Sequence, residues 1–317
     1  MSAAARREDE GRYRFDWSYL EASSEVRALE QRALHGQWLI ESLAWETPVD
    51  PALAWMPEPL FPLAGSDLAR RLGPARIEPL RADLCCHIVS QLLHGEQGAL
   101  LAASDLVARM PDLGSKLFAA TQVVDEARHV QVFDRYLRDK VGRRDPISPE
   151  LEEVLRRIDR APGWELKVLG TQVILEGLAL ATLGTLQHVS GEPLLRQIAQ
   201  YVLRDEGRHV SFSVQVLAEA AHRATPAETE EREQFVFELV ALLHERQLFG
   251  ALWTRADLPL AECLAITAAS PAQQGYRRIL FSRILGTLDR VGLLSARLLA
   301  RFAEIGVATR RRGDVRP

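Results

Sequence analysis

The residues that could do chemistry in this chain lie in two copies of nearly the same hexapeptide, DEARHV and DEGRHV, which begin eighty residues apart. Each copy places a glutamate three residues before a histidine, as Glu126 with His129 and as Glu206 with His209. Three residues are close to one helical turn, so the two side chains of a pair point in the same direction. Each hexapeptide therefore predicts two metal ligands on one helix face.

A further glutamate lies thirty residues before each of these pairs, in an otherwise apolar stretch: Glu96 in QLLHGEQGALLA and Glu176 in VILEGLALA. Turn residues lie midway along both intervals, at Pro111 and at Gly191. Fifteen helical residues rise roughly 22 Å, so each upstream glutamate returns to the height of its Glu-x-x-His pair on an antiparallel helix. The spacing predicts two helical hairpins that bring their ligands together.

Four glutamates and two histidines in this arrangement are the ligand set of a di-iron or di-manganese four-helix bundle. Carboxylates bridge two cations and offset their charge, and imidazole suits iron. Single Glu-x-x-His pairs also occur by chance on solvated helix faces. Two copies with the same upstream glutamate and the same midway turn favour a metal site. The predicted metal ligands are Glu96, Glu126, His129, Glu176, Glu206 and His209.

The elements that must position these ligands are long segments rich in Leu, Ala, Val, Gln and Glu and poor in Gly and Pro, which favours helices. The expected bundle helices lie around 86–103, 115–138, 164–188 and 195–222, with a short crossover helix at 149–160 and further helices near 228–251 and 274–305. No alternating strand pattern competes with them. We expect an all-α fold with a ferritin-like four-helix bundle.

The whole chain, 1–317, is expected to form a single domain. Residues 1–84 would be an N-terminal wrapping segment, 85–222 the metal-binding bundle, and 223–317 a set of C-terminal helices. Because the ligands and turns repeat at a shift of eighty residues, 90–136 should superpose on 170–216.

The composition limits the function classes. A net charge of -4, with arginines interleaved among acidic residues, gives no general attraction to nucleic acid or to anionic lipid. The charged N-terminus is unlike a signal peptide, and no run approaches the roughly eighteen apolar residues that a membrane helix requires. We therefore expect a cytoplasmic protein with no nucleic-acid partner and no membrane. The three cysteines show no zinc or redox spacing and fit small apolar positions.

These motifs resemble the ferritin-like di-iron carboxylate superfamily, in particular the branch that holds ribonucleotide reductase small subunits, bacterial multicomponent monooxygenases and acyl-carrier-protein desaturases. The resemblance covers about residues 85–222, and the Asp-Glu-x-Arg-His form is most similar to the monooxygenase hydroxylase subunits. It implies two iron ions, with manganese and iron as an alternative pair. Glu126 would then bridge the ions, and Glu126 and Glu206 are the expected catalytic carboxylates.

The resemblance also implies outer partners for the ligands. Asp125 and Asp205 would accept the outer N–H of the histidine across the bundle, Asp125 from His209 and Asp205 from His129. Arg128 and Arg208 would pair with these aspartates, or would be solvated helix charges. Two glutamines one turn before a ligand glutamate could reach the site or a substrate: Gln122 and Gln172.

Several markers of individual subfamilies are missing. Phe133 replaces the radical tyrosine of ribonucleotide reductase subunits. Thr171 and Gly98 replace the cross-linking tyrosine and valine of the ligand-binding oxidases, and Leu180 replaces a threonine of the hydroxylases. Arylamine N-oxygenases have a third histidine where this chain has Val202. The sequence therefore matches the superfamily and fits no single subfamily in all its markers.

Three functions fit this ligand set. The first is a di-metal oxidoreductase that activates dioxygen to hydroxylate, N-oxygenate or desaturate a small, largely apolar organic substrate, with an electron-donor protein or reductase as partner and a homodimer as a possible assembly. The alternatives are iron oxidation and storage, or a radical subunit like that of ribonucleotide reductase. The expected pocket is apolar, with few hydrogen-bonding groups and no nearby tyrosine. It would be lined by Leu92, Leu93, Ala99, Leu100, Ala103, Phe133, Val173, Ala179, Leu180, Val202 and Ser213.

Overall fold

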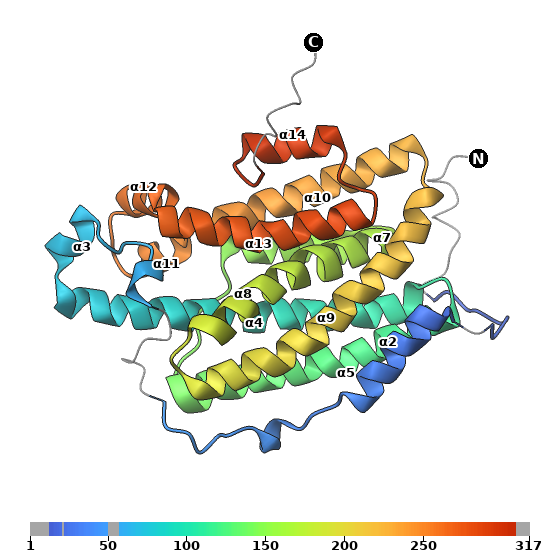
Figure 1. Cartoon of the computed structure of the whole chain (residues 1–317), viewed down its shortest axis with the longest axis horizontal. Coiled ribbons are helices and arrows are strands. Elements are labelled where there is room, and N and C mark those ends of the chain that lie inside the picture. Colours follow the sequence, from blue (N-terminus) through green and yellow to red (C-terminus); the bar gives the residue numbers. More distant parts are fainter. Residues whose placement is uncertain (1–12, 21, 50–56, 309–317) are drawn as a thin grey trace, which may run out of the picture.

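The computed structural model describes residues 13–20, 22–49 and 57–308, and within them it contains helices and no β-strand. Four long helical runs form an antiparallel bundle, as the sequence predicts, and the other helices pack on two of its sides and near one end (Figure 1). The bundle consists of α4 (Pro74–Arg109), α5 (Leu113–Tyr136), the run α7 (Gly163–Val168), η4 (Leu169–Leu175) and α8 (Glu176–Val189), and α9 (Pro193–His222).

In each hairpin of the bundle, a capping side chain marks where the second helix begins. The Asp112 side chain caps α5 by accepting the backbone N–H of Ser115 at 2.8 Å. Glu192 caps α9 by accepting the N–H of Leu194 at 2.8 Å, and Pro193 occupies the first helical position, where no N–H is needed. Gly114, expected as part of the first turn, lies inside the first turn of α5 instead.

The second hairpin contains a π-helix that the sequence pattern does not predict. In η4 (Leu169–Leu175) the backbone N–H of Glu176 bonds to the carbonyl of Thr171, five residues back. α4 stays α-helical through the matching turn before Glu96. The predicted eighty-residue repeat therefore differs locally just before a candidate ligand, where π-helical turns are often found in proteins.

The first bundle helix is longer than expected. α4 begins at Pro74, inside the predicted wrapping segment, and it continues through Pro79, which lies inside the helix and has no N–H to donate. The rest of the described N-terminal part does wrap the bundle: α2 (Ser24–His35) packs across α5 and α9 (Figure 1). It continues through the short turn η1 (Ile40–Ser42). The turn η2 (Glu58–Leu60) and helix α3 (Asp67–Leu72) then lead into α4.

The crossover and C-terminal helices cover the other side of the bundle. α6 (Pro149–Arg160) is the expected crossover helix and packs against α10. The predicted C-terminal helix at 274–305 is interrupted, because Gly292 adopts a positive φ of 73° between two helices. The C-terminal elements are α10 (Pro226–Arg246), α11 (Gly250–Arg255), α12 (Leu260–Ala269), α13 (Pro271–Arg290) and α14 (Ala296–Glu304).

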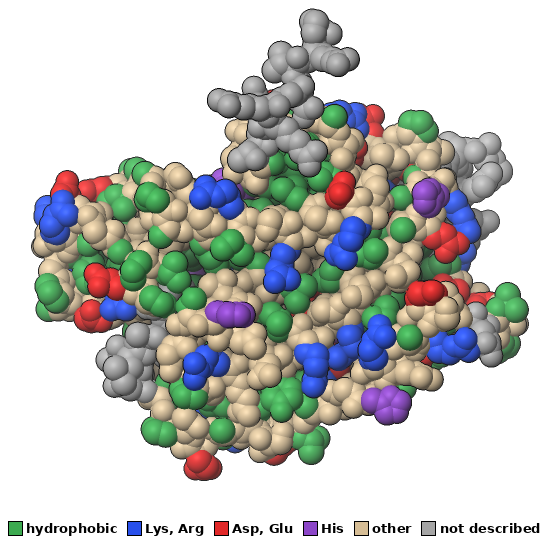
Figure 2. All heavy atoms as spheres, in the orientation of Figure 1, with side chains coloured by type: hydrophobic (Ala, Val, Ile, Leu, Met, Phe, Trp, Pro, Cys, Tyr) green, Lys and Arg blue, Asp and Glu red, His purple; other side chains and the backbone are tan. Residues whose placement is uncertain are grey.

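One expectation about membranes is wrong. The continuous helical run 163–189 is long and apolar enough to cross a membrane by length and composition, with a mean hydropathy of 1.5. However, 89% of its apolar window is buried inside the protein, because this run is covered by the other bundle helices and by α13. Its composition is therefore that of a core helix. The outer face in Figure 2 shows Lys, Arg, acidic and apolar side chains interspersed.

Candidate metal centre

The bundle brings all six predicted ligands into its interior. Glu96 comes from α4, Glu176 is the first residue of α8, and α5 and α9 each contribute one Glu-x-x-His pair. Each of the six side chains is buried, with at most 5% exposure. They form a polar layer between two apolar regions: Phe118 and Phe212 stack on one side with ring centroids 4.2 Å apart, and Phe133 and Val202 pack in the cluster on the other side.

The six residues divide into two groups with donor atoms within 4.8 Å of one another. The first group surrounds Nδ1 of His129, which lies 3.4 Å from Glu96 Oε2, 3.4 Å from Glu126 Oε2 and 3.1 Å from Glu206 Oε1. Ligands about 2 Å from one ion lie roughly 3 Å from each other. These distances therefore fit a single cation.

The second group surrounds Nδ1 of His209 in the same way. This atom lies 3.3 Å from Glu126 Oε1, 3.5 Å from Glu206 Oε2 and 3.6 Å from Glu176 Oε2. Glu126 and Glu206 belong to both groups, and each turns one oxygen toward each histidine. This is the arrangement of two carboxylates that bridge a pair of cations.

The atoms that would bind the cations lack partners within the protein. Buried polar atoms are normally hydrogen-bonded, so unpaired ones require an explanation. The unpaired buried atoms at this site are Glu126 Oε2, His129 Nδ1, Glu176 Oε2, both carboxylate oxygens of Glu206, and His209 Nδ1. The donor set and its unpaired atoms fit two hard divalent metal ions.

The charges of the ligand residues also fit two metal ions. The four glutamates carry four negative charges when ionised, which two divalent cations would balance. Without cations, burial raises the pKa of Glu96 and of Glu176 well above the ordinary value, and the charge of Glu206 raises both further. The site therefore disfavours four ionised glutamates unless cations balance their charge.

The charged form of the two histidines, by contrast, is favoured. Burial acts to lower the pKa of His129 and His209, but their aspartate and glutamate neighbours outweigh it and raise the pKa of both. Burial likewise acts to raise the pKa of Glu126, and the close contacts with both histidines hold it low instead. The imidazoles are thus strongly coupled to the carboxylates around them.

The outer nitrogens of the histidines meet aspartates across the bundle, as the sequence leads us to expect. His129 Nε2 lies 3.3 Å from Asp205 Oδ2, and His209 Nε2 lies 3.3 Å from Asp125 Oδ2. Such contacts fix the ring orientation and leave Nδ1 facing the site. The hydrogen bonds to the histidines outweigh burial and lower the pKa of both aspartates.

The two arginines are buried in this network and are not solvated helix charges. Arg128 and Arg208 are 8% and 7% exposed. Arg208 Nη2 donates to Asp205 at 2.7 Å and to Asp125 at 3.1 Å, and Arg128 Nη2 contacts the same two carboxylates. Two positive charges therefore balance the two aspartates, which leaves the four glutamates for the cations.

The sequence matches a known protein family over this whole arrangement. Residues 39–292 match the family described as p-aminobenzoate N-oxygenase AurF, which is more than half of the 317 residues. The chain belongs to this AurF family. It is therefore a member of the ferritin-like di-iron carboxylate superfamily and a non-haem di-iron oxygenase or oxidase. A comparison with curated protein sequences finds no match.

Solved structures show the same fold. The dimanganese(II) NrdF of Streptococcus sanguinis has a TM-score of 0.58 at 14% identity, over 93% of this chain and 99% of its own. The R2-like ligand-binding oxidase with an aerobically reconstituted Mn/Fe cofactor has a TM-score of 0.53 at 18% identity, over 89% and 94%. A variant of that oxidase with an aerobically reconstituted Fe/Fe cofactor has a TM-score of 0.56 at 18% identity, over 89% and 95%.

The family match confirms the predicted superfamily and adds an N-oxygenase family to the groups that the motifs resemble. Val202 stands where arylamine N-oxygenases are expected to have a third histidine, and it is fully buried in an apolar cluster. This AurF-family chain therefore presents four glutamates and two histidines.

Contacts of the AurF-family site with the N-terminal segment were missed by sequence reasoning. Gln37 donates to Asp125 at 3.0 Å and accepts from Arg128. The indole N–H of Trp38, expected to be a core or interface residue, donates to Asp205 at 2.7 Å. Nothing local in the sequence marks these two residues, because their partners lie at least 88 positions away.

Of the two glutamines flagged by the sequence, Gln122 reaches the carboxylates and Gln172 reaches Gln122. Gln122 Nε2 donates to Glu176 Oε1 at 2.8 Å and to Glu126 Oε1 at 3.2 Å. Gln172, on the π-helix, donates to Gln122 at 2.7 Å. Both glutamines are fully buried, so Gln122 orients carboxylate oxygens from inside the bundle and Gln172 supports it.

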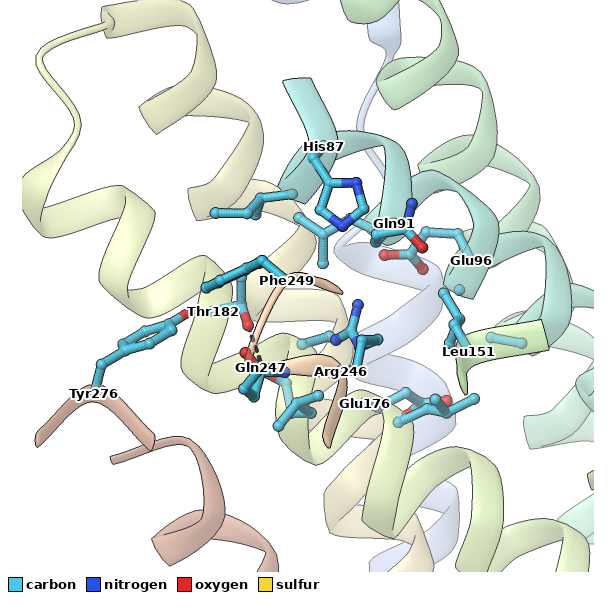
Figure 3. A pocket seen from close by; sticks show the side chains of 17 residues that line it. His87, Gln91, Glu96, Leu151, Glu176, Thr182, Arg246, Gln247, Phe249 and Tyr276 are labelled. Carbon is cyan, nitrogen blue, oxygen red and sulfur yellow. Dashed lines mark hydrogen bonds between the residues drawn. The ribbon is translucent and has the colours of Figure 1, made fainter. Parts of the chain in front are cut away.

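A cavity opens beside Glu96 and Glu176, between α4, α8, α10 and α13 (Figure 3). It measures about 60 Å³ as the space open to the centre of a water molecule. The cavity lining is mainly apolar, but it has more hydrogen-bonding groups than the sequence leads us to expect. Of the predicted lining residues only Leu92, Ala99 and Ala179 contribute, and the polar side chains come from α4 and α8 as well as from the C-terminal helices. Those polar residues are His87, Gln91, Thr182, Arg246, Gln247 and Tyr276.

A tyrosine that the sequence does not single out, Tyr276, lines the cavity. Phe133 and Tyr136 lie close to His129 on the same helix. Tyr136 points to Glu192, whose carboxylate accepts its hydroxyl at 2.9 Å, and does not line the cavity. Tyr276 comes from α13, about seventy residues after the last candidate ligand, and only tertiary packing brings it to the cavity.

Proposed function

We propose that Glu96, Glu126, His129, Glu176, Glu206 and His209 bind two metal ions, iron with iron or manganese with iron, and that the enzyme uses dioxygen to oxidise a small organic substrate. The unpaired donor atoms of the two groups carry this proposal. A bound pair of such ions supplies the redox chemistry that dioxygen reduction requires. The six residues lie in a buried layer between two apolar clusters, which would protect this chemistry from water.

The residues of the chain have separate parts in this proposal. Glu126 and Glu206, which belong to both groups, would hold both ions. Asp125 and Asp205 orient the histidines, and Gln122 orients Glu126 and Glu176 from within the bundle. The cavity beside Glu96 and Glu176 admits the substrate.

The reaction requires electrons and protons from outside the chain. Inserting one oxygen atom from O2 into a substrate consumes two electrons and two protons and releases one water molecule. Desaturation by O2 also takes two external electrons and two protons, and releases two waters. An electron-donor protein or reductase is therefore part of the proposal. We also propose a cytoplasmic location, where the three buried cysteines would stay free thiols, and homodimerisation.

The family suggests the first substrate to test. We expect the iron-loaded, reduced protein to consume O2 with p-aminobenzoate or a related arylamine and to incorporate one labelled oxygen atom, detected by mass spectrometry with ¹⁸O2. Val202 in place of a third histidine makes hydroxylation and desaturation products equally important to search for. Iron oxidation without substrate oxidation, with iron accumulating far beyond two ions per chain, would favour storage instead.

A radical subunit is the other alternative, and Tyr276 is the tyrosine that could serve it. Electron paramagnetic resonance after oxygenation should show little long-lived tyrosyl radical, because oxidising equivalents pass to the substrate. A stable signal near one per chain that disappears in Tyr276→Phe would support the radical subunit.

A further inference from the structure

The polar side chains of the cavity differ in whether their hydrogen bonds are already used. Gln91 donates to the carbonyl of Pro146 at 2.9 Å and accepts the N–H of Ser148 at 2.8 Å, which ties its amide to the backbone after α5. Thr182 donates to the carbonyl of Leu178 at 3.0 Å. These side chains line the cavity and have their partners within the protein.

Arg246 is different, because it forms no direct ion pair. Among residues 13–20, 22–49 and 57–308, no carboxylate oxygen lies within 4.0 Å of its guanidinium and no hydrogen bond to it is formed. The residue is half-buried, and its Nε is buried without any partner. Burial lowers the pKa of this arginine, while Tyr276 and Glu150 act in the opposite direction. An arginine stays protonated in proteins, so the cavity wall contains a cation whose donors are free to bind a ligand.

The position of Arg246 makes it part of the cavity wall. It is the last residue of α10, a helix outside the four that carry the candidate ligands. Figure 3 shows its side chain reaching in among the lining residues, together with Glu176 and Gln91. His87 lies in the same lining, and its Nδ1 also has no hydrogen-bond partner. Burial lowers the pKa of His87, and the positive charge of Arg246 lowers it further.

Building on the proposed function, we propose that Arg246 is a specificity-determining residue that binds a carboxylate group of the substrate and so directs the rest of the molecule toward Glu96 and Glu176. A planar guanidinium matches a carboxylate with two parallel hydrogen bonds. The two cavity glutamates do not occupy it, because both belong to the metal groups and lie beyond ion-pair distance. C-terminal helix α10 therefore sets substrate choice for a centre built by other helices.

The size of the cavity limits the rest of the ligand. One water needs roughly 10–15 Å³ of such space and occupies about 30 Å³ as liquid. A cavity of about 60 Å³ therefore holds about four waters, or one ring or a short chain. The expected substrate class is a monocarboxylic acid with one ring or a short aliphatic chain, and the reacting atom lies away from the carboxylate.

The test compares binding of benzoate, hexanoate and neutral benzamide to metal-loaded full-length protein by calorimetry without oxygen. Wild type should bind at least one of the acids and prefer benzoate to benzamide at least tenfold. Arg246→Gln keeps the length of the side chain and removes its charge, so it should lose that preference, and Arg246→Lys should retain part of it. Arg278→Gln, on the exposed face of α13, is the matched control and should bind as wild type does.

Three results would overturn the assignment: no binding of either acid at millimolar concentration, equal binding of benzoate and benzamide by wild type, or unchanged benzoate binding in Arg246→Gln. The last result would mean that the metal ions or another group hold the carboxylate. Because no turnover is needed, acid-selective binding without oxidation would count against the proposed function alone. Oxidation with no dependence on the carboxylate or on Arg246 would count against this inference alone.

Discussion

At the scale of single residues, Glu126 and Glu206 differ from the other four candidate ligands because each faces both histidines. Removing a carboxylate that belongs to both groups should disturb both ions, whereas removing a residue of one group should weaken one. Protein loaded anaerobically with ferrous iron should hold about two ions per chain by elemental analysis. Glu126→Ala should hold less than about half an ion. His129→Ala should keep about one ion.

Asp125→Asn tests the outer contacts separately. It leaves every candidate ligand in place but removes the charge that accepts from His209, so metal affinity should fall by about 10–100-fold. Titration of the metal-free protein with ferrous iron measures this change. Glu304→Gln, far along the C-terminal helix α14, is a suitable control with the same loss of charge. Equal affinity in Asp125→Asn and wild type would contradict a positioning role for Asp125.

His87 gives a prediction about pH. Burial lowers the pKa of His87 in the folded protein below its ordinary value of 6.5, although Asp145 opposes this shift. The unfolded chain therefore binds a proton at this residue more readily, and stability is lost as pH falls from about 7 through 6.5 toward the folded pKa. The loss cannot exceed about 1.4 kcal/mol per pH unit for one group. Urea unfolding at several pH values should show a shallower loss in His87→Gln than in wild type.

The control for this measurement is His222→Gln, because His222 is exposed at the end of α9. This variant should follow the wild-type pH profile. A His87→Gln profile parallel to that of wild type would show that the buried imidazole does not contribute to the acid sensitivity of the fold.

At the scale of elements, the π-helical turn before Glu176 depends on close packing with the crossover helix. A Cβ atom added to Gly170 would come within 2.6 Å of Cγ1 of Ile158, which is 3% exposed on α6. Gly170→Ala should therefore destabilise the fold by about 1–3 kcal/mol through overpacking. It should also weaken metal binding, because Glu176 follows the turn that must shift.

Gly286→Ala is the matched control for Gly170→Ala. A Cβ at Gly286 meets nothing within 4 Å, and this residue lies on the exposed side of α13. The change should stabilise the protein by roughly 0.5–1 kcal/mol, because alanine favours a helix. Denaturant unfolding compares both variants, and equal stability of the two would remove the packing argument for the π-helical turn.

The elements also show how far sequence reasoning reaches. Periodicity and caps locate the bundle helices and the crossover α6, because these are decided by local propensity and by Pro193 or Asp112 at the termini. The ligand spacing brings six residues to one place, since helix geometry is regular. The π-helical turn, the early start of α4 and the break at Gly292 depend on which helix packs against which. Arg246 and Tyr276 reach the cavity for the same reason, and no motif marks them.

At the scale of the whole molecule, metal binding and folding are linked. Cations that bind only the folded chain stabilise it by about 2.7 kcal/mol when free metal is 100 times Kd. For a chain of 317 residues this corresponds to a Tm increase of about 4 °C. Thermal unfolding with and without ferrous iron under argon measures the shift. Glu206→Ala should show no comparable increase, and a similar increase in that variant would place the stabilising metal elsewhere.

The protons held by the metal-free carboxylate cluster have a consequence for iron uptake in the cell. Glu96, Glu176 and both histidines have raised pKa values without cations, so loading must expel the protons they carry. Uptake of metal is then also a release of acid, measurable as a pH drop in weakly buffered solution. Mass action makes apparent affinity fall as the medium acidifies. The acidity of the surroundings would therefore set how much of this enzyme carries its metals, apart from the supply of iron itself.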